Sequence, residues 1–193
     1  MTDNSQKPDA TEVPIKTTGS SVVYQNPWIT IHEDSTLLPS GKEGIYGYME
    51  SKDSVMVAVL NDNQEVYLVR AFRYPSKSWG WEFPGGGGEG EELTVAARRE
   101  VEEETGIRSR HCEKIGESLV CNGLMTERMT TCVAYDISFD GNQDLADEAL
   151  TDMRFFSQDE ILEMVDSGEI NDGQTITGIF YLQRWIHKKG KTA

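Results

Sequence analysis

Residues 85–107, GGGGEGEELTVAARREVEEETGI, constrain the fold of this chain more than any other segment. A run of glycines opens the segment, and residues 99–107 then hold four glutamates and a single arginine. Like charges three or four residues apart on a helix are unfavourable by about 0.2–0.5 kcal/mol per pair. Such crowding of carboxylates with few nearby cations predicts a bound positive partner, most simply a metal ion.

The helical periodicity of this segment separates its carboxylates. With Leu93 at zero and about 100° per residue, the apolar residues define a stripe from roughly 300° to 80°. Glu100 and Glu104 fall inside the stripe at roughly 340° and 20°, Glu103 lies on its edge near 280°, and Glu102 points away. Charges on an apolar face are costly unless they are paired or coordinating. We therefore expect the carboxylates of the second half to face one interior point.

Composition excludes several classes of partner. The net charge of -15 argues against nucleic acid and against an anionic membrane, because both require a positive surface. Cys112, Cys121 and Cys132 are odd in number and lack the spacing of zinc ligands, so we expect free core thiols in a reducing compartment. The chain has a polar N-terminus and no apolar stretch of about 18 residues, which predicts a cytoplasmic protein.

The order of sequence patterns predicts an α+β fold with a small preceding sheet. Residues 1–18 are polar, contain two prolines and are expected to form a disordered tail. Runs of β-forming residues around a turn at residues 39–42 predict a small antiparallel sheet within residues 19–51. Residues 52–193 are expected to form the main domain, with helices packed on a mixed sheet. Outside the acidic helix, its expected elements are a hairpin (55–60 and 66–72), strands at 117–121, 130–137 and 153–156, and helices at 158–165 and 174–187.

The glycine-to-glutamate segment resembles the Nudix box at all nine specified positions, namely Gly85, Glu91, Arg99, Glu100, Val101, Glu103, Glu104, Gly106 and Ile107. The resemblance implies a Nudix fold, a mixed sheet sandwiched between helices, and a hydrolase that cleaves a nucleoside diphosphate linked to another group. It also implies a Mg²⁺ or Mn²⁺ cofactor, which suits the reaction because divalent ions neutralise phosphoryl oxygens and activate water. Glu100, Glu103 and Glu104 would be the metal ligands, and Glu103 would also help to orient water.

The same resemblance assigns structural roles around the box. Glu91 and Arg99 would form a pair that holds the loop to the helix. A backbone carbonyl often completes the coordination in this family, and either Gly85 or Pro84 would supply it here. The choice stays open because Gly88 stands where the family often carries a glutamate.

The residues before the box resemble the corresponding segment of ADP-ribose pyrophosphatases. The resemblance rests on RAFRYP at 70–75 and WEFPG at 81–85, and it extends over nearly all of residues 25–187. It implies that Arg73 reaches the phosphates or the terminal ribose of the substrate, for which a bidentate guanidinium is well suited. An exposed arginine at a strand end is the alternative. Glu82 would be either a substrate contact or a structural partner.

The N-terminal strands resemble those that carry base-stacking aromatics in relatives, in some cases across a dimer interface. Trp28 and Tyr46 are the candidates here, and a core position is the alternative for both. We expect the region 19–51 to mediate a homodimer.

A general base is expected from a loop after the box. The loop 141–152 offers Asp144, Asp147 and Glu148, of which Glu148 aligns best with relatives. Glu127 is the second candidate, and a solvated loop carboxylate is the alternative to both. We therefore expect Glu148 and Glu103 to be the catalytic residues.

The expected substrate is ADP-ribose, cleaved to AMP and ribose 5-phosphate, but one position departs from the family pattern. Sixteen residues beyond the box glycine, ADP-ribose enzymes carry proline and dinucleoside polyphosphate enzymes carry tyrosine, whereas this chain has Asn122. Another nucleotide sugar, such as a GDP-hexose, is the enzymatic alternative. A non-catalytic ligand sensor is the other, although a sensor has no need of every metal-binding glutamate.

Overall fold

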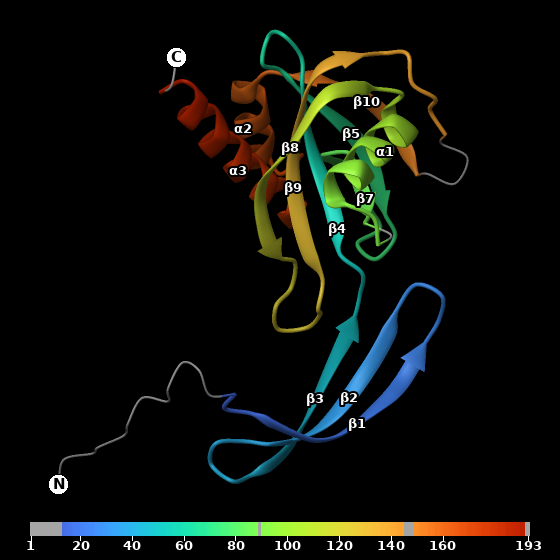
Figure 1. Ribbon diagram of the computed structural model, residues 1–193, viewed down its shortest axis with the longest axis vertical. Coiled ribbons are helices and arrows are strands. Elements are labelled where there is room, and N and C mark those ends of the chain that lie inside the picture. The colour runs from blue at the N-terminus through green and yellow to red at the C-terminus, as the bar shows by residue number, and fades with distance from the viewer. Residues whose placement is uncertain (1–12, 89, 145–148, 192–193) are drawn as a thin grey trace, which may run out of the picture. The chain divides into compact units, whose positions relative to one another are not determined.

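The computed structural model describes residues 13–88, 90–144 and 149–191, and its contacts divide the chain into two units (Figure 1). The N-terminal unit contains the described residues up to Ser51 together with Cys121–Thr126. The C-terminal unit contains the other described residues, beginning at Lys52.

The N-terminal unit is a three-stranded antiparallel sheet in the order β1-β2-β3. Its strands are β1 (Lys16–Gln25), β2 (Thr30–Leu37) and β3 (Glu43–Glu50). The tail was predicted to extend to residue 18, but Lys16 already pairs with Leu37, and Thr17 pairs with Thr36. Threonine is β-branched and favours a strand, so polar composition alone was a poor guide to the start of this sheet.

The loop Cys121–Thr126 completes the N-terminal unit, although it is about 75 residues away in sequence. The Met49 N–H donates to the Leu124 carbonyl at 2.8 Å, and the Thr126 N–H donates to the Met49 carbonyl at 3.1 Å. The Tyr46 hydroxyl donates to the Gly123 carbonyl at 2.9 Å. These bonds tie the loop to β3, an association that no local sequence pattern indicated.

The C-terminal unit is built on a mixed seven-stranded sheet. Its central order is β10-β5-β4-β9-β8, with β6 paired to β5 and β7 paired to β4. The β4–β9 pair is parallel and the other pairs are antiparallel, which confirms the predicted mixed sheet. The strands are β4 (Ser54–Leu60), β5 (Val66–Arg73), β6 (Ser78–Glu82), β7 (Gly85–Gly87), β8 (Arg108–Leu119), β9 (Arg128–Ser138) and β10 (Leu150–Phe156).

Helices cover both faces of this sheet, as the predicted sandwich requires (Figure 1). On one face Val55, Val57 and Val59 of β4 pack with α1, whereas the alternate residues of β4 pack in a cluster with α2 and α3. Burial on both faces explains why β4 is an uninterrupted apolar run. The helices are α1 (Leu93–Thr105), α2 (Gln158–Ser167) and α3 (Gly173–Lys189).

Some predicted elements differ from the structure. The strand expected at 117–121 overlaps the end of a much longer strand, β8, which ends at Leu119. The residues of β8 are mostly polar and none is fully buried, so its hydrophobic signal is weak. The cysteines are free, but only Cys132 is fully buried. Cys112 is half-buried and Cys121 is exposed, so the core assignment was wrong for Cys121.

No helix within the described ranges is long and apolar enough to cross a membrane.

Candidate active site

Capping residues fix the position of the acidic helix α1. At its start the Glu92 carboxylate accepts hydrogen bonds from the backbone N–H groups of Thr94 and Val95. At its end Gly106 adopts a left-handed conformation with φ of 68°, and its N–H donates to the Glu102 carbonyl. Glycine adopts that conformation at little cost and commonly ends helices. The helix therefore begins just after the glycine loop and carries its glutamates in the last two turns.

The glutamates of α1 differ in exposure as the helical periodicity predicted. Glu104 is buried, with 8% of its surface exposed, beside the buried Val101. The side chain of Glu100 is 14% exposed, whereas that of Glu103 is 47% exposed. A carboxylate is rarely buried without partners, so the surroundings of Glu100 and Glu104 must stabilise their charge.

The glycines of β7 lie against two of these carboxylates. The Gly85 N–H donates to Glu104 Oε2 at 3.0 Å. A Cβ atom on Gly86 would lie 2.6 Å from a carboxylate oxygen of Glu100, and one on Gly85 would lie 2.1 Å from the Val55 carbonyl oxygen. Gly85 therefore requires glycine, because a side chain would push the backbone of β4 away, whereas a side chain at position 86 would displace the Glu100 carboxylate.

Arg99 joins the loop and the helix through three carboxylates. Its guanidinium lies 2.9 Å from Glu91, 3.0 Å from Glu100 and 2.9 Å from Glu103, and it donates to the Gly87 carbonyl at 3.2 Å. The predicted Glu91–Arg99 pair is present. Burial alone lowers the pKa of the Arg99 guanidinium, but the three carboxylates outweigh burial and raise the pKa overall.

A second ion pair lies at the ends of β5 and β6. Arg73 Nε donates to both oxygens of the Glu82 carboxylate at 3.0 and 3.1 Å, and an Nη atom lies 2.5 Å from Oε2. Glu82 is 3% exposed, whereas the side chain of Arg73 is 59% exposed. The hydrogen bond to Glu82 is the main cause of a raised pKa of Arg73, and the charge of Glu104 also raises it. One edge of the Arg73 guanidinium is thus held by Glu82, the side chain is largely open to solvent, and its charge is influenced by Glu104 of α1.

Glu127, the second candidate for the general base, is held through one of its oxygens. Glu127 Oε1 accepts hydrogen bonds from Ser54 Oγ at 2.6 Å and from Gln174 Nε2 at 3.3 Å. Ser54 begins β4 and Gln174 lies in the first turn of α3. Sequence reasoning missed both partners, because they are 73 and 47 residues from Glu127 and belong to no local pattern.

The loop after β9 contacts the acidic half of α1. The Asp144 N–H donates to the Glu103 carbonyl at 2.8 Å, and Gln143 Nε2 donates to the Glu104 carbonyl at 2.8 Å. Glu148, the first candidate for the base, and Asp147 lie outside the described residues.

Comparison with known proteins identifies the family. A model of the Nudix domain matches residues 50–177, which is 128 of the 193 residues. This chain belongs to the Nudix family. It is a Nudix hydrolase with a second matched region at residues 15–49, described as the N-terminal domain of nucleoside diphosphate sugar hydrolases. The latter match covers most of the β1–β3 sheet.

Relatives of this Nudix hydrolase span most of its length. An ADP-ribose pyrophosphatase of Bacillus subtilis is 27% identical over 170 residues, covering 87% of this chain and 92% of the relative. A CMP-5'-(N-acetyl-N-hydroxy-3-aminopropyl)phosphonate hydrolase of Streptomyces rubellomurinus is 26% identical, covering 83% and 78%. A crystal structure described as an ADP compounds hydrolase superposes with a TM-score of 0.81 at 18% identity, over 91% of this chain and 96% of that one. At that identity the superposition supports the fold alone.

The α1 region of this Nudix hydrolase has the donor chemistry that a divalent cation requires. Three carboxylates surround the Arg99 guanidinium, a fourth, that of Glu104, accepts the Gly85 N–H, and hard oxygen donors are the ligands that Mg²⁺ and Mn²⁺ prefer. Glu100, Glu103 and Glu104 are the residues that would hold the cation, which would neutralise phosphoryl charge and polarise a phosphorus–oxygen bond. Among the described residues, no three acidic, histidine or cysteine side chains form a ready-made metal site. Glu103 instead faces Arg99, and Glu104 faces the Gly85 N–H.

The backbone ligand stays a prediction. The Pro84 carbonyl accepts the Val57 N–H at 2.9 Å and so already has a partner in the sheet. Gly85 therefore remains our choice for the carbonyl that would complete the coordination.

The two predicted stacking aromatics lie in the N-terminal unit. Trp28 is 82% exposed and lies in the turn between β1 and β2. Its backbone N–H donates to Asn26 Oδ1 at 2.9 Å. The prediction that Trp28 lies in a strand was therefore wrong. A core role for Trp28 is also wrong. Tyr46 is in β3 and 43% exposed. Each ring is accessible for stacking, and the stacking role stays a prediction.

Proposed function

We propose that this Nudix hydrolase cleaves ADP-ribose to AMP and ribose 5-phosphate in a reaction that depends on Mg²⁺ or Mn²⁺. The observation that carries the proposal is the Arg73–Glu82 pair: the side chain of Arg73 is 59% exposed, and the pKa of Arg73, raised mainly by the hydrogen bond to Glu82, is also raised by the charge of Glu104 on α1. The free edge of Arg73 would bind a phosphate of the substrate, and the buried Glu82 would keep the guanidinium oriented. The activity of the Bacillus subtilis relative supports the choice of ADP-ribose.

Substrate choice is tested with a panel of nucleoside diphosphate sugars, each assayed with Mg²⁺ and with Mn²⁺ by phosphatase-coupled phosphate release. We expect ADP-ribose to have the highest kcat/KM and to give AMP and ribose 5-phosphate as products. A GDP-hexose or a cytidine derivative that is turned over faster would replace ADP-ribose in the proposal. Ligand binding without turnover of any substrate would instead indicate a sensor.

A second candidate, hydrolysis of another nucleotide conjugate, rests on two observations. Asn122 stands where ADP-ribose enzymes carry proline, and the Streptomyces relative, which acts on a cytidine conjugate, is nearly as similar as the Bacillus relative. The panel therefore includes cytidine and guanosine compounds.

We infer that Glu148 accepts the proton of the attacking water. The contacts of Gln143 and Asp144 with the backbone carbonyls of Glu104 and Glu103 support this role, because they place the start of the loop beside the C-terminal end of α1. Glu148→Gln is expected to lower kcat by about 10²-fold or more, with a loss of the acidic limb of the pH–rate profile. If Glu148→Gln is nearly as active as the wild type while Glu127→Gln is slow, the role belongs to Glu127.

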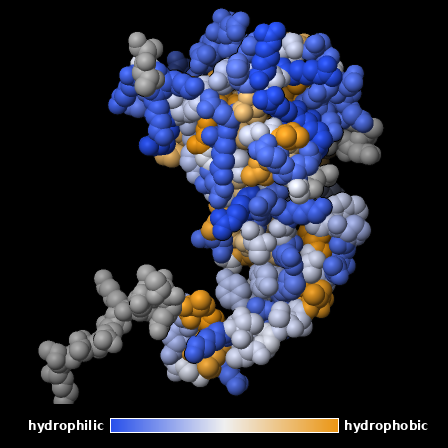
Figure 2. Space-filling model, in the orientation of Figure 1, coloured by the Kyte–Doolittle hydropathy of each residue, from blue (hydrophilic) through white to orange (hydrophobic). Residues whose placement is uncertain are grey.

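We also infer that the N-terminal unit forms a homodimer. Its sheet exposes apolar side chains, as Figure 2 illustrates, and all ten residues of the edge strand β1 are exposed. Val23 is 56% exposed and Ile45 is 72% exposed, which suits an interface better than solvent. Sedimentation equilibrium should give a dimer for the wild type and a monomer for Val23→Glu/Ile45→Glu. A monomeric wild type, or a double variant that remains dimeric, contradicts this inference.

A further inference from the structure

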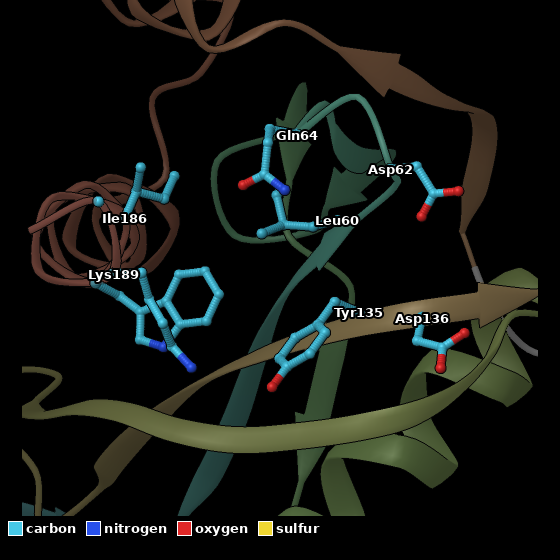
Figure 3. A pocket seen from close by; sticks show the side chains of 9 residues that line it. Leu60, Asp62, Gln64, Tyr135, Asp136, Ile186 and Lys189 are labelled. Atoms are coloured by element: carbon cyan, nitrogen blue, oxygen red, sulfur yellow. The ribbon is translucent and has the colours of Figure 1, made fainter. Parts of the chain in front are cut away.

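A cavity of about 550 Å³ lies away from the Nudix box, on the face of the sheet that carries α3. It is bounded by the end of β4, the turn that follows it, β9 and the C-terminal end of α3 (Figure 3). Leu60 of β4 lines this cavity. On the same strand, four residues earlier, Met56 pairs with Gly85 of the glycine strand β7. At about 3.3 Å per residue, the cavity begins more than about 10 Å along the sheet from the glycine strand. It is therefore distinct from the α1 carboxylates.

Two aromatic rings in this cavity already face an ammonium group. The rings of Tyr135 and Trp185 have centroids 5.8 Å apart. The Nζ atom of Lys189 lies 6.0 Å from the Tyr135 centroid and 5.1 Å from the Trp185 centroid. These distances lie within the range at which a ring quadrupole attracts a cation. A side chain of the protein thus shows that this wall suits an ammonium ion.

The charges around the cavity favour a cation over an anion. Asp62 and Asp136 lie on one side and Lys189 on the other, with Leu60 and Tyr135 between them (Figure 3).

Two more charged residues, Arg110 and Glu113, change the net charge around the cavity only slightly. Asp136 pairs with Arg110 at 3.5 Å, but the side chains are 48% and 82% exposed, so the pair is weak. Glu113 lies 3.4 Å from Lys189. Three carboxylates and two cations leave one negative charge in excess, which disfavours a phosphate or a second nucleotide.

Two independent observations, one of the backbone and one of the buried indole N–H of Trp185, also point to a ligand in this cavity. Gln64 and Asp136 have φ angles of 61° and 55°, and both line the cavity. Only one other non-glycine residue in the described part of the chain has a positive φ, and such strain in non-glycine residues is concentrated at ligand sites. In addition, the Nε1 atom of Trp185 is buried and has no acceptor among the described residues. An unsatisfied N–H is unfavourable, and an oxygen on a ligand would satisfy it.

We propose that this cavity binds an organic ammonium compound that carries a hydroxyl or carbonyl oxygen. The ammonium takes the place of the Lys189 side chain over the Tyr135 and Trp185 rings, and its oxygen accepts the Trp185 N–H. Glu113 is the carboxylate beside this position, and Asp62 and Asp136 attract the ammonium from across the cavity. The site is separate from the proposed hydrolysis of nucleotide sugars.

Choline is the probe, and its uncharged isostere 3,3-dimethyl-1-butanol is the matched ligand. Isothermal titration of the full chain should show choline binding in the millimolar range, at least about 10-fold tighter than the isostere. Equal affinity for the two compounds, or no binding of choline, overturns the proposal. Choline should bind the Glu103→Gln variant with unchanged affinity, which separates this test from the test of the hydrolase function.

Lys189→Met provides the sharpest test, because it removes the side-chain ammonium that would compete with the ligand for the two rings. The variant should bind choline about 3- to 10-fold more tightly, whereas Lys188→Met, with the same change of charge at the neighbouring residue, should change the affinity much less. Tyr135→Leu should weaken binding about 10-fold, with thermal unfolding recorded to verify the fold. Weaker binding by Lys189→Met, or an equal gain in both lysine variants, contradicts the assigned position of the ammonium.

Discussion

Replacing Glu103 by glutamine should abolish Mg²⁺-dependent turnover while leaving the protein folded. Glu103 is the most exposed of the three predicted metal ligands, and its contact with Arg99 is a partly exposed ion pair, which Arg99 shares with Glu91 and Glu100. Removing such a pair should lower the free energy of unfolding by less than about 1 kcal/mol. Loss of one carboxylate from the cation site should lower kcat by about 10³-fold or more. Steady-state kinetics over a range of Mg²⁺ concentrations and urea unfolding measure the two effects.

Glu102→Gln is the matched control for this experiment. Glu102 is the preceding residue of the same helix, but it pairs with Arg108 at 2.7 Å and accepts the Asn142 N–H, away from the glycine strand. This variant should retain near wild-type activity. Unchanged activity in Glu103→Gln, or equal losses in both variants, would remove the basis for assigning Glu103 to the metal.

Arg73→Met should damage both stability and activity, because it leaves the charge of Glu82 buried without its partner. Fully buried pairs cost about 3–5 kcal/mol when one partner is removed, and we expect about 2–3 kcal/mol here because Arg73 is more than half exposed. The loss of a phosphate contact should lower kcat/KM by about 10²-fold. Arg70→Met, on the same strand but beside the Trp79 ring, should change neither quantity much.

The double variant Arg73→Met/Glu82→Gln separates the structural role of the pair from its role in binding. Glutamine carries no charge to bury, so the double variant should regain most of the lost stability. Its kcat/KM should stay low, since no guanidinium is present to meet the substrate. Recovery of activity together with stability would mean that Arg73 acts only as the structural partner of Glu82.

The acidic helix could be predicted from the sequence because its signals are local. The period of the apolar residues placed Glu104 inside and Glu103 on the edge, as their exposed fractions of 8% and 47% confirm. The hairpin of β4 and β5 followed in the same way from two apolar runs. The Nudix resemblance then supplied chemistry that periodicity alone cannot provide.

The remaining features depend on contacts between distant residues. β7 consists of three glycines, which present no side-chain pattern, so its pairing with β4 had no sequence signal. The Glu127 contacts join the residue before β9 to β4 and α3, and nothing near Glu127 in the sequence indicates Ser54 or Gln174. The turn position of Trp28 was missed because the β-forming run was taken to begin at Trp28, whereas β2 begins at Thr30.

The bonds between β3 and the loop Cys121–Thr126 have a consequence for engineering the chain. A truncation that removes the first 51 residues appears natural from the linear sequence, but it would leave the Leu124 carbonyl and the Thr126 N–H without their partners on Met49. That loop leads directly into Glu127, so the cut would release the backbone next to a candidate base. A transplantable catalytic fragment therefore needs a redesigned, shorter connection between β8 and β9.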